Sequence, residues 1–171
     1  PENQKYGAFH GKESFKEAIV NFYERQYGVT LHKDEEVCIL YGTKNGLVAL
    51  PTCVVNPGET VLLPDPGYTD YLAGVMLADA NPVPLELEPP DYLPDWNKID
   101  PQVLKDTKLI YLTYPNNPTG STATQSVFDE AVQRFKDTDT KIVHDFAYSA
   151  FGFDDKNPSI CLLYTSDAAD E

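Results

Sequence analysis

The sequence of 171 residues is poor in basic residues and has no long apolar run. It carries 13 lysine and arginine residues against 27 aspartate and glutamate residues, which gives a formal net charge of −14. A surface that neutralises phosphates needs a basic face, so this balance argues against nucleic-acid binding and against an anionic membrane surface. No apolar run approaches the roughly 20 residues of a membrane span. We therefore expect neither a nucleic acid nor a membrane as a partner.

Cysteine is also scarce, and its positions show no metal-binding or redox spacing: Cys38, Cys53 and Cys161. An odd number of cysteines suits a reducing compartment, so we expect a cytoplasmic protein without a metal site. Apolar residues make up 42% of the chain and aromatic residues 12%. That content is sufficient for a hydrophobic core, and the length predicts about one domain.

The two ends of the sequence differ in character from its middle. Position 1 is proline, and residues 1–7 are polar with no helix start. Residues 161–171, with the sequence CLLYTSDAADE, resemble the translation of a transposon-type sequencing adaptor. We therefore expect residues 1–160 to form one partial domain and residues 161–171 to be a non-native tail. The alternative interpretation is an ordinary tail that is first apolar and then acidic.

Strand-like and helix-like patterns alternate along the chain. Short apolar runs typical of buried strands occur at 37–41, 61–63, 83–87, 109–112 and 141–144. Apolar residues at helical spacing occur at 11–27, 47–55, 68–76 and 124–135. This alternation predicts βαβ units, and therefore an α/β fold with three layers (α/β/α) around a mostly parallel sheet.

Individual residues refine this prediction. Gly28 should end the first helix, and Thr124 should cap the last one. Pro51 should kink or break the second helix, because proline lacks the N–H that an interior position needs. Pro84 indicates an edge position for its strand. The segment 88–100 is rich in proline and acidic residues, so we expect a surface loop there.

The clearest indication of a site lies where four of the predicted strands end. Polar or glycine-rich sequence follows each of them: 42–46 (GTKNG), 64–68 (PDPGY), 114–120 (YPNNPTG) and 144–148 (HDFAY). In an open parallel sheet, the loops at the carboxyl ends of the strands line the ligand crevice. We therefore expect these four segments to converge on one ligand.

Taken singly, these residues also allow plainer interpretations. Gly42, Thr43 and Lys44 open a predicted helix and could offer backbone N–H groups to an anion, but they match neither the P-loop nor the dinucleotide fingerprint. Gly42 could equally be a turn or packing glycine. Asp145 at a strand end needs a cation or a strong donor as its partner, unless it is a turn or cap residue. Asn117 could be a simple turn residue.

Segments 114–120 and 145–148 together resemble the large domain of the class I/II aminotransferases, the fold-type I enzymes that use pyridoxal 5′-phosphate. The resemblance extends over residues 1–160 and is closest to the bacterial PatA-like branch. It implies a homodimeric enzyme that transfers an amino group between an amino acid and a 2-oxo acid.

The resemblance also implies roles for particular residues. Asp145 would pair with the protonated pyridine nitrogen, which accepts electrons when the substrate Cα–H bond breaks. Tyr148 and Asn117 would donate hydrogen bonds to the phenolic oxygen of the cofactor. The remaining implied positions are an aromatic ring that stacks on the cofactor, three residues of the phosphate loop, and a tyrosine that reaches the neighbouring subunit's phosphate: Tyr68, Gly42, Thr43, Lys44 and Tyr6. The alternative is that Tyr68 and Tyr148 are core aromatics and Tyr6 a surface residue.

The sequence departs from the family pattern in one important respect. The family's Schiff-base lysine lies well beyond the segment 145–148, and Lys156, the only lysine after Asp145, has acidic flanks that do not match its motif. The carboxylate-binding arginine of the small domain is also missing, so we expect the chain alone to be inactive. Three alternatives remain open: a carbon–sulfur lyase or decarboxylase on the same fold, a cofactor-binding sensor domain of a transcription regulator, and a nucleotide-binding domain with phosphate at Gly42.

Overall fold

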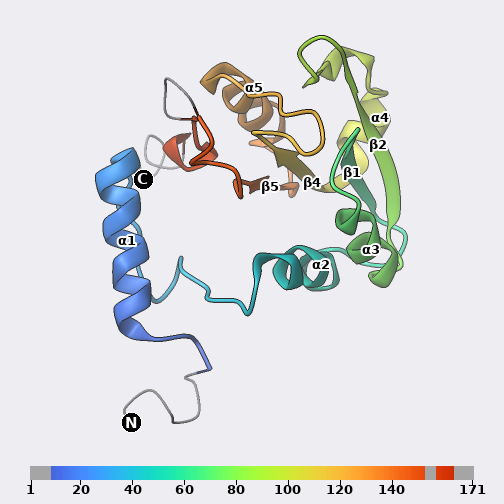
Figure 1. Ribbon diagram of the computed structural model, residues 1–171. Helices are drawn as coiled ribbons and strands as arrows, with labels where there is room; N and C mark the ends of the chain where they lie inside the picture. The colour runs from blue at the N-terminus through green and yellow to red at the C-terminus, as the bar shows by residue number, and fades with distance from the viewer. Residues whose placement is uncertain (1–8, 153–156, 164–171) are drawn as a thin grey trace. The chain divides into compact units, whose positions relative to one another are not determined.

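The computed structural model describes residues 9–152 and 157–163 (Figure 1). These residues belong to two compact units, the first made of residues 1–43 and 161–171 and the second of Lys44–Ile160. Tyr6 and residues 164–171 lie outside the described residues. The expected non-native tail therefore stays a prediction. No helix of the described residues is both long and apolar enough to cross a membrane.

The first unit contains the helix α1, Glu13–Tyr27. As predicted, it ends at Gly28, which has a left-handed backbone (φ 72°) that glycine adopts without steric cost. The apolar residues at helical spacing in this segment do not form a fully buried face, because Phe15 is 53% and Phe22 42% exposed and Ala18 is exposed as well. The buried residue of the helix is instead Lys16, whose ammonium lies 3.7 Å from Asp34.

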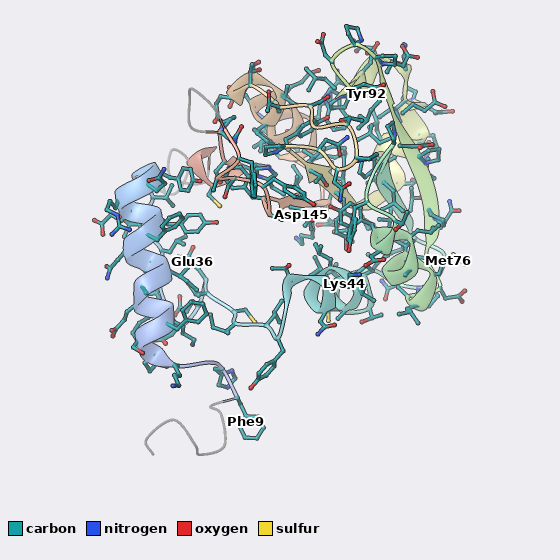
Figure 2. The ribbon with its side chains drawn as sticks, viewed as in Figure 1. Phe9, Glu36, Lys44, Met76, Tyr92 and Asp145 are labelled. Atoms are coloured by element: carbon teal, nitrogen blue, oxygen red, sulfur yellow. The ribbon has the colours of Figure 1, made fainter. Side chains whose placement is uncertain are left out.

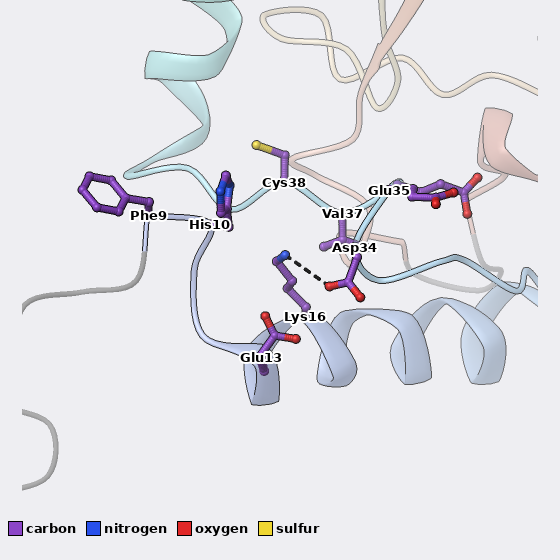
Figure 3. A pocket seen from close by; sticks show the side chains of 9 residues that line it. Phe9, His10, Glu13, Lys16, Asp34, Glu35, Val37 and Cys38 are labelled. Carbon is purple, nitrogen blue, oxygen red and sulfur yellow. Dashed lines mark ion pairs between the residues drawn. The ribbon is translucent and has the colours of Figure 1, made fainter.

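The segment 37–41 does not form the predicted strand. Leu40 and Tyr41 are 51% and 88% exposed, and no described residue pairs with the segment in a sheet. An apolar run becomes a strand only where a neighbouring strand satisfies its backbone, which explains the failure. Residues 34–38 instead line a pocket against the start of α1, where Figure 3 shows the ion pair of Lys16 with Asp34.

The second unit is built on a five-stranded sheet with the order β3-β2-β1-β4-β5 (Figure 1). The strands are β1 Thr60–Asp65, β2 Asn81–Glu88, β3 Leu93–Pro94, β4 Thr107–Thr113 and β5 Lys141–Asp145. β2, β1, β4 and β5 are mutually parallel, and the short β3 pairs antiparallel with β2. The helices of this unit are α2 Thr43–Val54, α3 Asp70–Leu77, α4 Pro101–Asp106, α5 Gln125–Phe135 and the short η1 Trp96–Lys98. The short helix η2, Ile160–Leu163, begins at the last residue of this unit and continues into the first unit. The predicted mostly parallel sheet is confirmed.

Side chains alternate between the two faces of the sheet and give it a helical layer on each side. Leu109 and Tyr111 of β4 pack in one cluster with residues of α2 and α3. On the opposite face, the ring of His144 in β5 lies 4.5 Å from that of Phe128 in α5. Successive residues of a strand point to opposite faces, so α5 covers the face away from α2 and α3. The three-layer α/β/α arrangement predicted from the sequence is confirmed.

Helix α2 runs through Pro51 unbroken, so of the two predicted outcomes, a kink or a break, the break is wrong. Proline at this position cannot donate to the carbonyl of Leu47 four residues earlier. The Tyr111 hydroxyl donates to that carbonyl instead, at 2.9 Å. The helix continues because a side chain of β4 replaces the hydrogen bond that proline removes.

The segment 88–100 is more ordered than the expected surface loop. It contains β3 and the turn η1, and Trp96 is only 2% exposed and packs edge-on against Phe135 at 5.8 Å between ring centroids. Helix α4, which the sequence pattern did not predict, follows directly. Its signal was present in Asp100, because this residue accepts a hydrogen bond from the Gln102 N–H at 2.7 Å and caps the helix.

Two further predictions concern single positions. Among the described residues, β1 is the only pairing partner of β2 at Pro84, because β3 pairs with β2 at Leu87 and Glu88. The predicted edge position is therefore confirmed. Thr124 occupies the N-cap of α5, but its hydroxyl bonds to the Ser126 hydroxyl at 2.8 Å and not to the backbone.

Candidate active site

The carboxyl ends of β4 and β5 bring Asp145 beside Thr113, its register partner (Figure 2 labels Asp145). Asp145 Oδ1 accepts a hydrogen bond from the Ala147 N–H at 3.2 Å, and Oδ2 accepts one from the Tyr71 hydroxyl at 2.7 Å. The Thr113 Oγ1 lies 2.6 Å from the same hydroxyl. The Tyr71 hydroxyl donates its hydrogen bond to Asp145, so the Thr113 hydroxyl donates to the Tyr71 oxygen.

Asp145 is a half-buried carboxylate whose two donors are electrically neutral. Burial, and to a lesser degree the neighbouring carboxylate, raise the pKa of Tyr71 far above its usual value, so its hydroxyl keeps its proton. A carboxylate oxygen can accept two hydrogen bonds. Asp145 therefore has capacity for a further donor, and a cationic N–H would form the strongest bond there.

Asn117 and Tyr148 come from different loops and meet at the same end of the sheet. The Asn117 side-chain amide donates to the Tyr148 hydroxyl oxygen at 3.2 Å. Tyr148 is 39% exposed and follows β5 by three residues, and Asn117 follows β4. The Tyr148 hydroxyl hydrogen therefore remains available to a ligand.

The neighbouring Asn116, which was not predicted as a site residue, links two of the loops. It is 3% exposed, and its amide donates to the carbonyl of Pro66 at 3.3 Å and to the Thr119 hydroxyl at 2.9 Å. These contacts join the loop after β1 to the loop after β4. Asn116 thereby fixes the backbone that carries Asn117.

Tyr68 is held in place by its own hydroxyl. It donates to Asp70 at 2.8 Å, and its ring lies edge-on to that of Tyr71 at 5.5 Å between centroids. Asp70 also pairs with the Lys44 ammonium at 2.6 Å (Figure 2 labels Lys44), and this hydrogen bond raises the pKa of Lys44 to about 12. The Lys44 ammonium lies 5.7 Å from the centre of the Tyr68 ring. The Lys44 ammonium therefore already contacts the Asp70 carboxylate and the face of the Tyr68 ring.

Helix α2 begins at Thr43, directly after Gly42, so the predicted helix start is present, but no strand precedes it among the described residues. Gly42 has a left-handed backbone (φ 90°) with nothing within 4 Å of a hypothetical Cβ, so conformation and not space requires glycine here. Gly42 and Thr43 belong to the first unit, whereas Lys44 belongs to the second. Within the second unit, contacts link Lys44 and Tyr68 through Asp70, Tyr68 and Asp145 through Tyr71, and Asn117 directly with Tyr148. Their convergence on one ligand stays a prediction.

Two residues of this site were missed because their role appears only in three dimensions. Tyr71 reads in the sequence as one more apolar position of a helical stripe, and Thr113 as the last residue of a strand. Only a general indication was present in the sequence. A buried tyrosine needs a partner for its hydroxyl, and Asp145 at a predicted strand end could supply a carboxylate.

His144 precedes Asp145 but lies on the opposite face of the sheet, between the rings of Phe128 and Phe146 at 4.5 and 4.6 Å. Its Nε2 lies 3.1 Å from the Tyr114 carbonyl, and the Ile160 N–H donates to its Nδ1 at 3.5 Å. This pattern fits a neutral ring protonated at Nε2. Burial lowers the pKa of His144 from 6.5 to about 4, so the ring is uncharged at neutral pH.

Comparison with known proteins gives consistent results. Residues 1–169 match the family described as aminotransferase class I and II. The chain is 46% identical over 174 residues to the L-glutamine--4-(methylsulfanyl)-2-oxobutanoate aminotransferase of Bacillus subtilis (strain 168), covering 99% of this chain and 43% of that protein. It is also 46% identical over 160 residues to the transaminase BacF of the same organism, covering 93% of this chain and 40% of BacF.

A solved structure of an aminotransferase from Staphylococcus aureus superposes with a TM-score of 0.92 at 79% identity, covering 95% of this chain and 43% of that one. The apo structure of BacF from Bacillus subtilis superposes with a TM-score of 0.90 at 44% identity, over 95% of this chain and 42% of that one. The chain thus spans about two fifths of the length of these relatives. It belongs to the class I and II aminotransferase family.

Proposed function

We propose that this chain is the cofactor-binding part of a pyridoxal 5′-phosphate-dependent aminotransferase. The enzyme would transfer an amino group between an amino acid and a 2-oxo acid. Family membership supports the reaction class, and the name of one relative pairs an amino acid, glutamine, with a 2-oxo acid. The observation that carries the proposal is Asp145, a half-buried carboxylate at the carboxyl edge of a parallel sheet with capacity for a further donor.

Asp145 suits a pyridinium nitrogen in position and in chemistry. When bound, the cofactor supplies a protonated ring that withdraws electrons from the substrate carbon. The carboxylate would keep the proton on the ring nitrogen through a charge-assisted hydrogen bond. Because the existing donors of Asp145 are neutral, the pyridinium would be its cationic partner.

The neighbouring residues offer the remaining contacts that such a ring needs. Tyr148 and Asn117 would donate to the phenolic oxygen, and their mutual hydrogen bond supports this joint role. Tyr68 would contribute an aromatic face. The Lys44 ammonium is already paired with Asp70, so any help from Lys44 toward a phosphate would come from its backbone N–H at the start of α2.

Covalent attachment of the cofactor requires a lysine, which we expect in a longer polypeptide that contains this chain. Lys156 lies outside the described residues, and its flanking sequence favours no such role. We also propose that the enzyme is a homodimer, with Tyr6 reaching the phosphate bound by the partner subunit. Gly42 and Thr43 as phosphate-binding positions stay predictions from the sequence.

The proposal can be tested with the full-length enzyme, supplied with pyridoxal 5′-phosphate, L-glutamine and 4-(methylsulfanyl)-2-oxobutanoate. We expect amino transfer to the 2-oxo acid, and a drop of roughly 10²-fold or more in kcat/KM for Asp145→Asn. Asp139→Asn is a matched control, because the Asp139 side chain is 93% exposed and pairs only loosely with Lys108 at 3.9 Å.

Three results would count against the proposal. Absence of both cofactor retention and amino transfer with any amino acid would refute it. Products of carbon–sulfur cleavage or of decarboxylation would show a different reaction on the same fold. Equal activity of the Asp145 and Asp139 variants would refute the role of Asp145 while leaving the reaction class intact.

A further inference from the structure

We propose that Tyr71 is a positioning residue that fixes the Asp145 carboxylate for its contact with the cofactor ring. The consequence for cofactor binding rests on the function proposed above. The geometric part does not, because it concerns only residues of this chain. Tyr71 and Asp145 are separated by 74 positions in the sequence, and their hydroxyl–carboxylate distance is 2.7 Å.

The Tyr71 hydroxyl has one proton, and its surroundings direct that proton to Asp145. The Thr113 hydroxyl, 2.6 Å away, can satisfy the Tyr71 oxygen by donating to it. The high pKa of Tyr71 keeps the hydroxyl a donor. The Asp145 carboxylate is thereby held at both oxygens, by Tyr71 at Oδ2 and by the Ala147 N–H at Oδ1. Its remaining lone pairs point in fixed directions, which lowers the cost of ordering the group when a ring binds.

The ring of Tyr71 is itself immobilised. It is 1% exposed and stacks on the ring of Tyr111 at 4.5 Å between centroids, with only 16° between the planes. Tyr111 is anchored at its far end by the hydrogen bond to the Leu47 carbonyl, which is free because Pro51 has no N–H. The two stacked tyrosines therefore connect the interior of α2 with the carboxylate at the end of β5.

The test is a double-mutant cycle on the full-length enzyme, read as the dissociation constant of pyridoxamine 5′-phosphate. This ligand needs no covalent bond to a lysine, so the measurement is independent of turnover. Tyr71→Phe removes the hydroxyl and keeps the stacked ring. We expect it to weaken binding about tenfold or more when Asp145 is present, because a hydrogen bond to a charged group is lost. In the Asp145→Asn background the same change should have little effect.

Tyr114→Phe is the matched control. Tyr114 is also a buried tyrosine at the end of β4, and its hydroxyl donates to the Tyr92 carbonyl at 2.8 Å, away from Asp145. We expect this variant to bind pyridoxamine 5′-phosphate as the wild type does. Equal weakening by Tyr71→Phe with and without Asp145 would mean that Tyr71 acts only through general stability, and would overturn the inference.

A crystal structure of the apo Tyr71→Phe variant decides the geometric part separately. We expect the Asp145 carboxylate to rotate or to occupy more than one position once its Oδ2 partner is gone. An unchanged single conformer would overturn the inference even if binding were weakened. Failure of the wild type to bind pyridoxamine 5′-phosphate would refute the proposed function, and the crystallographic comparison would still decide the role of Tyr71.

Discussion

His144 gives the molecule a defined sensitivity to acid. Its ring is packed between two phenylalanines, and burial lowers its pKa from 6.5 to about 4. The unfolded chain therefore binds a proton at a higher pH than the folded chain does. Between pH 6.5 and 4, protonation favours the unfolded state, and the stability that the neutral ring contributes is fully present only above pH 6.5. The difference between the His144 pKa of 6.5 in the unfolded chain and about 4 in the folded protein corresponds to about 3 kcal/mol in the free energy of unfolding.

The perturbation is His144→Gln, whose amide can still donate to the Tyr114 carbonyl at the position that His144 Nε2 occupies, 3.1 Å away. The free energy of unfolding is measured in urea from pH 7.5 to pH 4 for both proteins. Carboxylates titrate in the same pH range, but they do so in the wild type and in the variant alike. The difference in unfolding free energy between the two proteins therefore reports the contribution of His144. We expect the stability of the wild type relative to the variant to fall by about 3 kcal/mol over this range.

The imidazole resonance of His144 provides a direct check, assigned by its absence in the variant. It should remain at its neutral position down to about pH 5 in the folded protein. A resonance that titrates near pH 6.5, or a stability difference that does not change with pH, would refute the account of a desolvated ring.

Two further predictions concern helix packing. Tyr111→Phe should lower the free energy of unfolding by about 1–3 kcal/mol, because the Leu47 carbonyl loses its donor. In a Pro51→Ala background the loss should be much smaller, because the backbone N–H gained at position 51 donates to that carbonyl instead. Equal losses in the two backgrounds, measured by urea denaturation, would contradict this explanation. Gly74→Ala should cost about 1–3 kcal/mol in the same assay, because the new Cβ would lie 2.7 Å from the Val48 carbonyl oxygen, and an unchanged midpoint would show that α2 and α3 can separate freely.

The order of strands and helices could be predicted because it depends on local periodicity. Residues 109–112 and 141–144 were recognised from apolar runs, and the register of β4 with β5 then places Thr113 beside Asp145. The segment 37–41 is also a short apolar run but has no partner strand among the described residues, and the local sequence cannot distinguish these cases. Pairing, not apolar character, decides whether a strand forms.

Long-range side-chain contacts explain most of what could not be predicted. Pro51 leaves α2 unbroken because the compensating hydroxyl comes from a residue 64 positions away from Leu47. The site was predicted as a set of strand ends because parallel topology brings them to one edge. The partner of Asp145 was not predicted, because only the packing of α3 on the sheet brings Tyr71 to it.

The prolines of β2 have a consequence for the behaviour of the molecule in crowded solution. Along residues 81–86 this strand pairs on one side only within the described part of the chain, with β1, and Pro82 and Pro84 offer no N–H. In sheets, such residues occur where the missing donor would face the free border. A strand of another molecule that paired with this edge of β2 would lack the hydrogen bonds from the backbone N–H groups of residues 82 and 84. This disfavours edge-to-edge aggregation at β2.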